Sequence, residues 1–106
     1  MKHDEFMSIV ESECQRCKRV LLKKSEHYSE EGEDRLEQFK CAAGLERTTP
    51  LAALAGFLGK HVTKFYLLIS REERGILVKE SEWNEVIGDM HNYLFLAKGI
   101  LEEEKQ

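Results

Sequence analysis

The sequence predicts an all-α protein, a helical bundle of three long helices and one short helix that is completed by dimerisation. Apolar residues recur at three- and four-residue steps over long stretches, and no stretch alternates apolar and polar residues as a strand does. The 106 residues include a single proline, which favours long helices. We expect one domain over residues 1–106, because a chain of this length ordinarily forms one hydrophobic core.

The first long helix is expected from about Asp4 to Tyr28. Its apolar residues fall on one helical face: Phe6, Ile9, Val10, Cys14, Cys17, Val20 and Leu21. Residues 29–33 lack apolar side chains and include a glycine, which predicts a loop. A short helix then fits Asp34 to Ala43, with Asp34 as its N-cap and Gly44 as the residue that ends it.

A third helix is expected from Pro50 to about Ser70. Thr49 followed by Pro50 predicts its start, because proline fits the first helical position and threonine caps it well. Gly56 and Gly59 lie inside this helix, where each costs about 1 kcal/mol relative to alanine. We expect the close approach of a neighbouring helix to explain both glycines.

The last helix follows a polar connection over residues 70–79, and Ser81 is its expected N-cap. Its main apolar stripe comprises seven residues: Trp83, Val86, Ile87, Met90, Leu94, Ala97 and Leu101. The charged tail from Glu102 to Gln106 is expected to fray.

The charge balance bears on the class of protein. With 20 acidic and 16 basic side chains the formal net charge is −4, so extensive nucleic-acid binding is not expected. The first helix does carry a basic run at residues 16–24, for which a solvated face is the favoured interpretation.

No run of 18 apolar residues exists, and the first residues are acidic where a signal peptide would be apolar. We therefore expect a cytoplasmic protein that does not cross a membrane.

The sequence has three cysteines, an odd number that does not suggest a disulfide framework. Cys14 and Cys17 form a CxxC spacing within the first helix, where core packing is favoured. A zinc site is the alternative, and its further ligands would come from Cys41, His27 or His61.

Two segments are apolar on every side of their helices, namely Phe65–Ile69 and Tyr93–Ala97. A surface helix normally has one apolar stripe and an opposite polar face. Four helices of this size offer little material to cover both segments, which predicts a two-fold homodimer. The alternative is that one of these helices runs through the centre of the monomer.

Two polar groups are candidate binding residues. Glu85, Asp89 and Asn92 lie at i, i+4 and i+7, so they share one helical side and could hold a hard cation such as Mg²⁺. A solvated helix face is the alternative. Lys60 and His61, with Lys64 nearby, form a basic cluster that could neutralise a phosphate. There the alternative is a structural histidine flanked by lysines that reach to solvent.

A third candidate lies at the end of the first helix, where Lys24 and Tyr28 precede the expected loop. Binding residues are often placed at such a position. Tyr28 could stack on a base, or it could anchor the loop in the core. The sequence contains no glycine-rich phosphate loop of the P-loop or dinucleotide-binding type and no serine-nucleophile elbow.

Several short elements occur in an order that resembles the nucleotide-modification-associated domain family, small and largely helical proteins of phages and prophages. They are Lys24-Ser-Glu-His-Tyr28, Asp34-Arg-Leu36 with Phe39-Lys40, Thr49-Pro50, Gly56, Lys60-His61 and Asp89-Met-His-Asn92-Tyr93-Leu94. The resemblance implies a phage-linked role near nucleotide or DNA metabolism. His27 and Ser29 depart from the family pattern, which has an acidic residue and a glycine there.

The chain is also loosely similar to the all-α nucleoside triphosphate pyrophosphohydrolases, helical dimers that hold Mg²⁺ with acidic residues on two helices. That similarity implies Glu85 and Asp89 as metal ligands. The glutamate–x–x–glutamate partner on the preceding helix is missing. Whether the protein is an enzyme therefore stays open.

Our leading hypothesis from the sequence is a prophage-encoded dimeric protein that binds a nucleotide or a related phosphorylated ligand. Its site would comprise six residues: Lys24, Tyr28, Lys60, His61, Asp89 and Asn92. The alternative is a non-enzymatic accessory module that binds another protein, in which the polar residues form a buried network.

Overall fold

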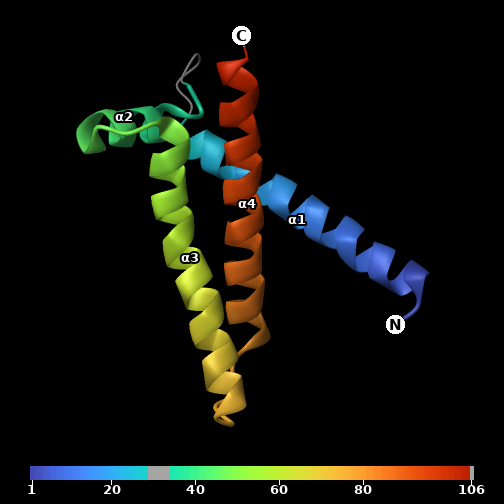
Figure 1. Cartoon of the computed structure of the whole chain (residues 1–106). Coiled ribbons are helices and arrows are strands. Elements are labelled where there is room, and N and C mark those ends of the chain that lie inside the picture. Colours follow the sequence, from blue (N-terminus) through green and yellow to red (C-terminus); the bar gives the residue numbers. More distant parts are fainter. Residues whose placement is uncertain (29–33, 106) are drawn as a thin grey trace. The chain divides into compact units, whose positions relative to one another are not determined.

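The computed structural model describes the backbone of residues 1–28 and 34–105, and the side chains of residues 1–23 and 34–105. It contains α1 (His3–Tyr28), α2 (Glu37–Glu46), α3 (Pro50–Glu73) and α4 (Glu80–Glu104), as Figure 1 shows. Within the described residues there is no strand, which confirms the all-α class and the three long helices with one short helix.

The chain divides into two compact units, Met1–Arg35 and Leu36–Gln106. The first unit is essentially α1, whose first turn carries Asp4 and Glu5. Carboxylates at this position stabilise a helix, because they face the positive end of its dipole. The expected single domain over residues 1–106 stays a prediction.

The second unit is built on the pair of α3 and α4, which lie side by side and antiparallel in Figure 1. One core cluster joins α2 to this pair, with Leu36, Phe39, Leu54 and Ile100 at its centre. A second cluster lies near the connection between α3 and α4, around Leu68, Val78 and Val86. There the Trp83 indole N–H donates a hydrogen bond to Glu72 Oε1 at 2.9 Å, which fastens the two helices together.

Two predicted boundaries of the short helix are wrong. α2 begins at Glu37, after Leu36, rather than at an Asp34 cap, and no side-chain cap hydrogen bond is made there. Burial of Leu36 in the core sets this start. Gly44 does not end the helix; the left-handed residue is Arg47, at φ 55°. The Thr48 N–H then donates to the Ala43 carbonyl at 2.9 Å.

The predicted start of α3 is confirmed. Thr49 is the N-cap, and its Oγ1 accepts a hydrogen bond from the Ala52 N–H at 3.2 Å. α3 continues to Glu73, past the expected end at Ser70, and Gly75 follows with a positive φ of 74° that only glycine adopts freely.

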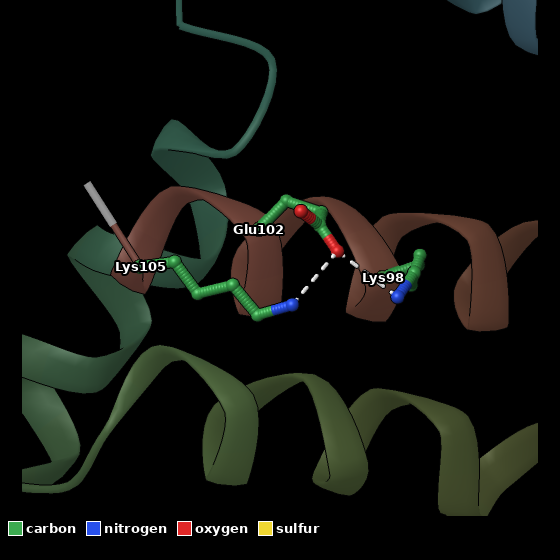
Figure 2. Close-up of polar contacts among 3 residues, drawn as sticks. All are labelled: Lys98, Glu102 and Lys105. Carbon is green, nitrogen blue, oxygen red and sulfur yellow. Dashed lines mark hydrogen bonds and ion pairs between the residues drawn. The ribbon is translucent and has the colours of Figure 1, made fainter.

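The expected cap of α4 is wrong, because Ser81 lies inside its first turn. Lys79 occupies the N-cap, and its N–H donates to Glu82 Oε2 at 3.2 Å. The helix also continues to Glu104 instead of fraying from residue 102. Figure 2 shows that Glu102 Oε1 contacts the amines of Lys98 and Lys105, at 3.0 and 3.3 Å. Such i,i+4 and i,i+3 pairs support the last turns of a helix.

The close approach of a neighbouring helix was expected to explain the two glycines of α3. Within the described part of the chain, this expectation is not borne out. A Cβ atom built on Gly56 or Gly59 would meet no atom within 4 Å apart from the local helix backbone. Both residues are exposed. No neighbouring helix of the second unit therefore accounts for these two glycines.

We expect Thr49→Ala to lower the free energy of unfolding by about 1 kcal/mol, because an unpaired helix N–H is left at the start of α3. Thermal or urea unfolding followed by circular dichroism measures the loss. Thr48→Ala is the matched control, since Thr48 is exposed and precedes the cap. An equal loss in both variants would contradict the cap assignment.

Candidate functional site

Two of the predicted polar residues, His61 and Asp89, meet on one edge of the α3–α4 pair. His61 Nδ1 lies 3.5 Å from Asp89 Oδ2, and both side chains are partly exposed. The His61 ring also packs against the Tyr93 ring, with centroids 4.9 Å apart and planes tilted by 37°. Tyr93 in turn contacts Phe39 of the core edge-on. His61 is thus held between a carboxylate and an aromatic ring that is itself anchored.

The lysines of α3 extend this polar edge. Lys60 Nζ lies 5.9 Å from the centroid of the Phe57 ring, a cation–π contact that orients the amine while leaving it accessible to solvent. Lys64 is exposed and one helical turn further on, so it shares this side of α3. The edge therefore presents two amines near His61, and they could attract an anion.

The acidic group of α4 is only partly assembled. Asp89 contacts His61, whereas Glu85 is exposed one turn before it. Asn92 is 4% exposed, and its Oδ1 has no hydrogen-bond partner within the described residues. Glu85, Asp89 and Asn92 thus differ strongly in exposure, and the Mg²⁺ site at Glu85 and Asp89 stays a prediction.

The remaining ligand-binding residues predicted from the sequence, Lys24 and Tyr28, have side chains outside the described residues, as do His27 and Ser29. Their place in the site stays a prediction.

Among the described side chains, neither unit alone contains the full set of ligands that the zinc alternative requires. Cys14 and Cys17 lie in α1, whereas Cys41 belongs to α2 in the other unit, and His27 lies outside the described side chains. The Cys41 thiol donates a hydrogen bond to Glu37 Oε1 at 3.5 Å, and this bond raises the pKa of Cys41. A raised pKa disfavours the thiolate, which is the form that binds metal.

Sequence reasoning missed a small hollow near the start of α3 and the end of α4. It has a volume of about 90 Å³ and is lined by Leu36, Lys40, Pro50, Ile100, Glu103 and Glu104. Lys40 and Glu103 form an ion pair beside it. The hollow is too small for a nucleotide, since ligand pockets ordinarily exceed about 300 Å³.

Comparisons with protein-family models, with curated proteins and with solved structures found no match for this chain. The resemblance to the nucleotide-modification-associated domain family therefore stays a prediction. Among the described residues, no helix is long and apolar enough to span a membrane.

Proposed function

We propose that this chain is a self-associating helical interaction module, in which two copies pack through the α3–α4 pair. The observation that carries the proposal is a row of apolar side chains outside both core clusters. We name this row the outer apolar face. It comprises seven residues: Leu58, Val62, Tyr66, Ile69, Ile87, Leu94 and Leu101.

The outer apolar face is substantially exposed to solvent in the single chain. Tyr66, Leu94 and Leu101 are 65%, 55% and 41% exposed, and the other four are partly buried. Contiguous apolar surface of this kind is uncommon on a soluble monomer and usually marks an interaction site. The two segments that are apolar on every side, Phe65–Ile69 and Tyr93–Ala97, supply three of its residues, Tyr66, Ile69 and Leu94.

Helical periodicity places this face on one side of the α3–α4 pair. In each helix the spacing of three, four and seven residues aligns its members. The opposite edge is marked by polar contacts, His61 with Asp89 and Arg71 with Glu82. The apolar row and the polar edge therefore lie on different sides of the same two helices, so a partner can cover the row without touching the polar edge.

A second copy of the chain is the partner that the dimensions favour. Helices of 24 and 25 residues are each about 36 Å long, and two adjacent helices are about 20 Å wide. Their shared face is thus about 700 Å², close to the ~800 Å² that each partner contributes to a stable interface. The start of α3, residues 50–59, contains no charged side chain that could repel its own copy.

The test is the concentration dependence of thermal unfolding. If two copies must separate before or during unfolding, the midpoint rises with protein concentration. We expect a rise of several degrees between about 1 and 100 µM chain. A midpoint independent of concentration over this range would contradict self-association.

A second candidate function is the binding of a nucleotide or a related phosphorylated ligand at the polar edge. The observation that favours it is the placement of His61, which contacts Asp89 through Nδ1 while the exposed Lys60 and Lys64 lie on the same side of α3. A protonated imidazole donates from both ring nitrogens, so in that form the ring can hold Asp89 through Nδ1 and donate from Nε2 to a phosphate oxygen whose charge the lysines balance. The sequence resemblance would connect such a ligand with nucleotide metabolism in phages.

Thermal shift with a panel of nucleotides, with and without Mg²⁺, tests this second candidate. A nucleotide at about one hundred times its dissociation constant should stabilise the chain by about 2.7 kcal/mol. The shift should be lost in the double variant Lys60→Ala/Lys64→Ala, because the amines that balance the phosphate charge are removed. The fold should be kept, since both lysines are exposed and outside the core clusters. The absence of a shift with every nucleotide at millimolar concentration would exclude this function.

A further inference from the structure

One side of α3 carries a row in which small side chains precede large ones. Its six members follow each other at steps of three and four residues, which places them on one side of the helix: Ala52, Ala55, Gly59, Val62, Tyr66 and Ile69. We name this row the α3 row, and its last three members belong to the outer apolar face. The charged side chains between residues 50 and 70, Lys60 and Lys64, lie on another side of α3.

The α3 row is accessible in the single chain. Ala52, Ala55 and Gly59 are exposed and Tyr66 is 65% exposed, while the other two members are partly buried. A Cβ atom on Gly59 would meet no atom within 4 Å apart from the local helix backbone. A glycine inside a helix is destabilising relative to alanine, so this open space needs an explanation outside the single chain. A second helix can cover the row and approach closely at Gly59.

We propose that α3 lies antiparallel to α3 of a second copy, with the α3 rows in contact. This inference rests on the self-association proposed above and gives it a direction. The steps of the row read the same from either end, so an antiparallel pair sets every small residue opposite a large one. Gly59 then faces Val62 of the second copy, and Ala55 faces its Tyr66. A parallel pair would instead set small against small and large against large, which leaves a gap beside a clash.

The charges at the ends of α3 favour the same direction. The row continues to Glu73, four residues after Ile69, and Glu73 is exposed. In a parallel pair the two Glu73 carboxylates would lie together and repel. In an antiparallel pair, Glu73 lies near the first turn of the other α3, where the helix dipole is positive and the exposed Arg47 precedes the helix.

α4 is consistent with the same two-fold axis. The axis crosses α3 at the level of His61, which contacts Asp89 and Tyr93 of α4. Ile87 and Leu94, the members of the outer apolar face nearest this level, lie on either side of it. Each is therefore brought towards the other in the second copy, so α4 extends the contact that the α3 row begins.

Disulfide formation between two cysteine variants tests the direction. Ala55→Cys and Tyr66→Cys are made separately in a full chain that also carries Cys14→Ala and Cys41→Ala. Cys17 is kept, because it is 2% exposed. The two variants carry tags of different mass, so that each cross-linked product is identified by its size. Both new cysteines replace exposed side chains, and the fold of the single chain should be retained.

We expect a disulfide in the mixture of the two variants and little in either variant alone. In the antiparallel pair, residue 55 of one copy lies opposite residue 66 of the other. Two residues at position 55 lie about 16 Å apart along the helices, as do two at position 66. That separation exceeds the ~7 Å between Cα atoms that a disulfide allows.

Gly59→Leu gives a second test that needs no cross-link. Leucine favours a helix more than glycine does, and the space around Gly59 is open in the single chain, so the helices should be retained. In the antiparallel pair the added side chain meets Val62 of the second copy, and self-association in sedimentation should weaken at least about tenfold. Gly44→Leu is the matched control, because Gly44 is an exposed glycine of α2 with equally open space.

Three results would overturn the antiparallel arrangement. The first is cross-linking of either cysteine variant with itself, as in a parallel pair or by chance collision. The second is the absence of a disulfide in the mixture, and the third is a Gly59→Leu variant that associates as the Gly44→Leu control does. Sedimentation of the unmutated chain separates these failures from that of the proposed function: paired chains would retain self-association through another contact, whereas single chains would contradict both.

Discussion

Leu94→Glu is expected to convert the self-associated protein into separate chains with little loss of helix. Leu94 is 55% exposed in the single chain, so the monomer fold tolerates a charge there. In the proposed pair, the same position lies in the outer apolar face of both copies. Two unpaired carboxylates would then be buried, and self-association should weaken by about a hundredfold or more. Sedimentation velocity measures the change.

Leu67→Glu is the matched control for this experiment. Leu67 is also 55% exposed, yet it lies on the Lys60 and Lys64 side of α3, about two turns from Lys60 and one turn from Lys64. It should associate as the unmutated chain does. If both variants associate normally, or if both become monomeric, the outer apolar face is not the interface.

Phe39→Ala is expected to produce the largest loss of stability from a single substitution. Phe39 is 0% exposed and contacts Phe57 and Tyr93 edge-on, with centroids 5.9 and 6.4 Å away. Truncation leaves a cavity between α2, α3 and α4 and should cost about 3–5 kcal/mol. For a unit of this size, the unfolding midpoint should fall by more than 10 °C, at roughly 4–8 °C per kcal/mol. Calorimetry measures this directly.

Leu45→Ala provides the comparison within the same helix. Leu45 is 87% exposed, so its truncation should change stability by less than about 0.5 kcal/mol. Similar losses for Phe39→Ala and Leu45→Ala would mean that α2 is not docked on α3 and α4 as described. Because Tyr93 also contacts His61, Phe39→Ala should loosen the polar edge as well.

The helices were predictable because their signals are local. Apolar periodicity identifies all four, and the Thr49–Pro50 pair fixes the start of α3 to the residue. The missed boundaries have two different causes, tertiary packing at the start of α2 and local side-chain pairs at the end of α4. The start of α2 follows the burial of Leu36, which overrides an Asp34 cap, and the last turn of α4 is supported by the Lys98–Glu102–Lys105 contacts.

The candidate site was predictable only in part. Spacing along α3 and α4 identified His61 and Asp89, but a sequence shows only which residues share a helical face. It does not show that the two faces meet, or that Tyr93 supports the histidine. The contrast between the buried Asn92 and the exposed Glu85 likewise depends on what surrounds α4 and has no local signal.

Light scattering of the unmutated protein tests the central claim, that the outer apolar face joins two copies. At about 50 µM in about 0.5 M NaCl, we predict a particle of at least twice the 12.3 kDa chain mass. A particle of 12.3 kDa would contradict the claim.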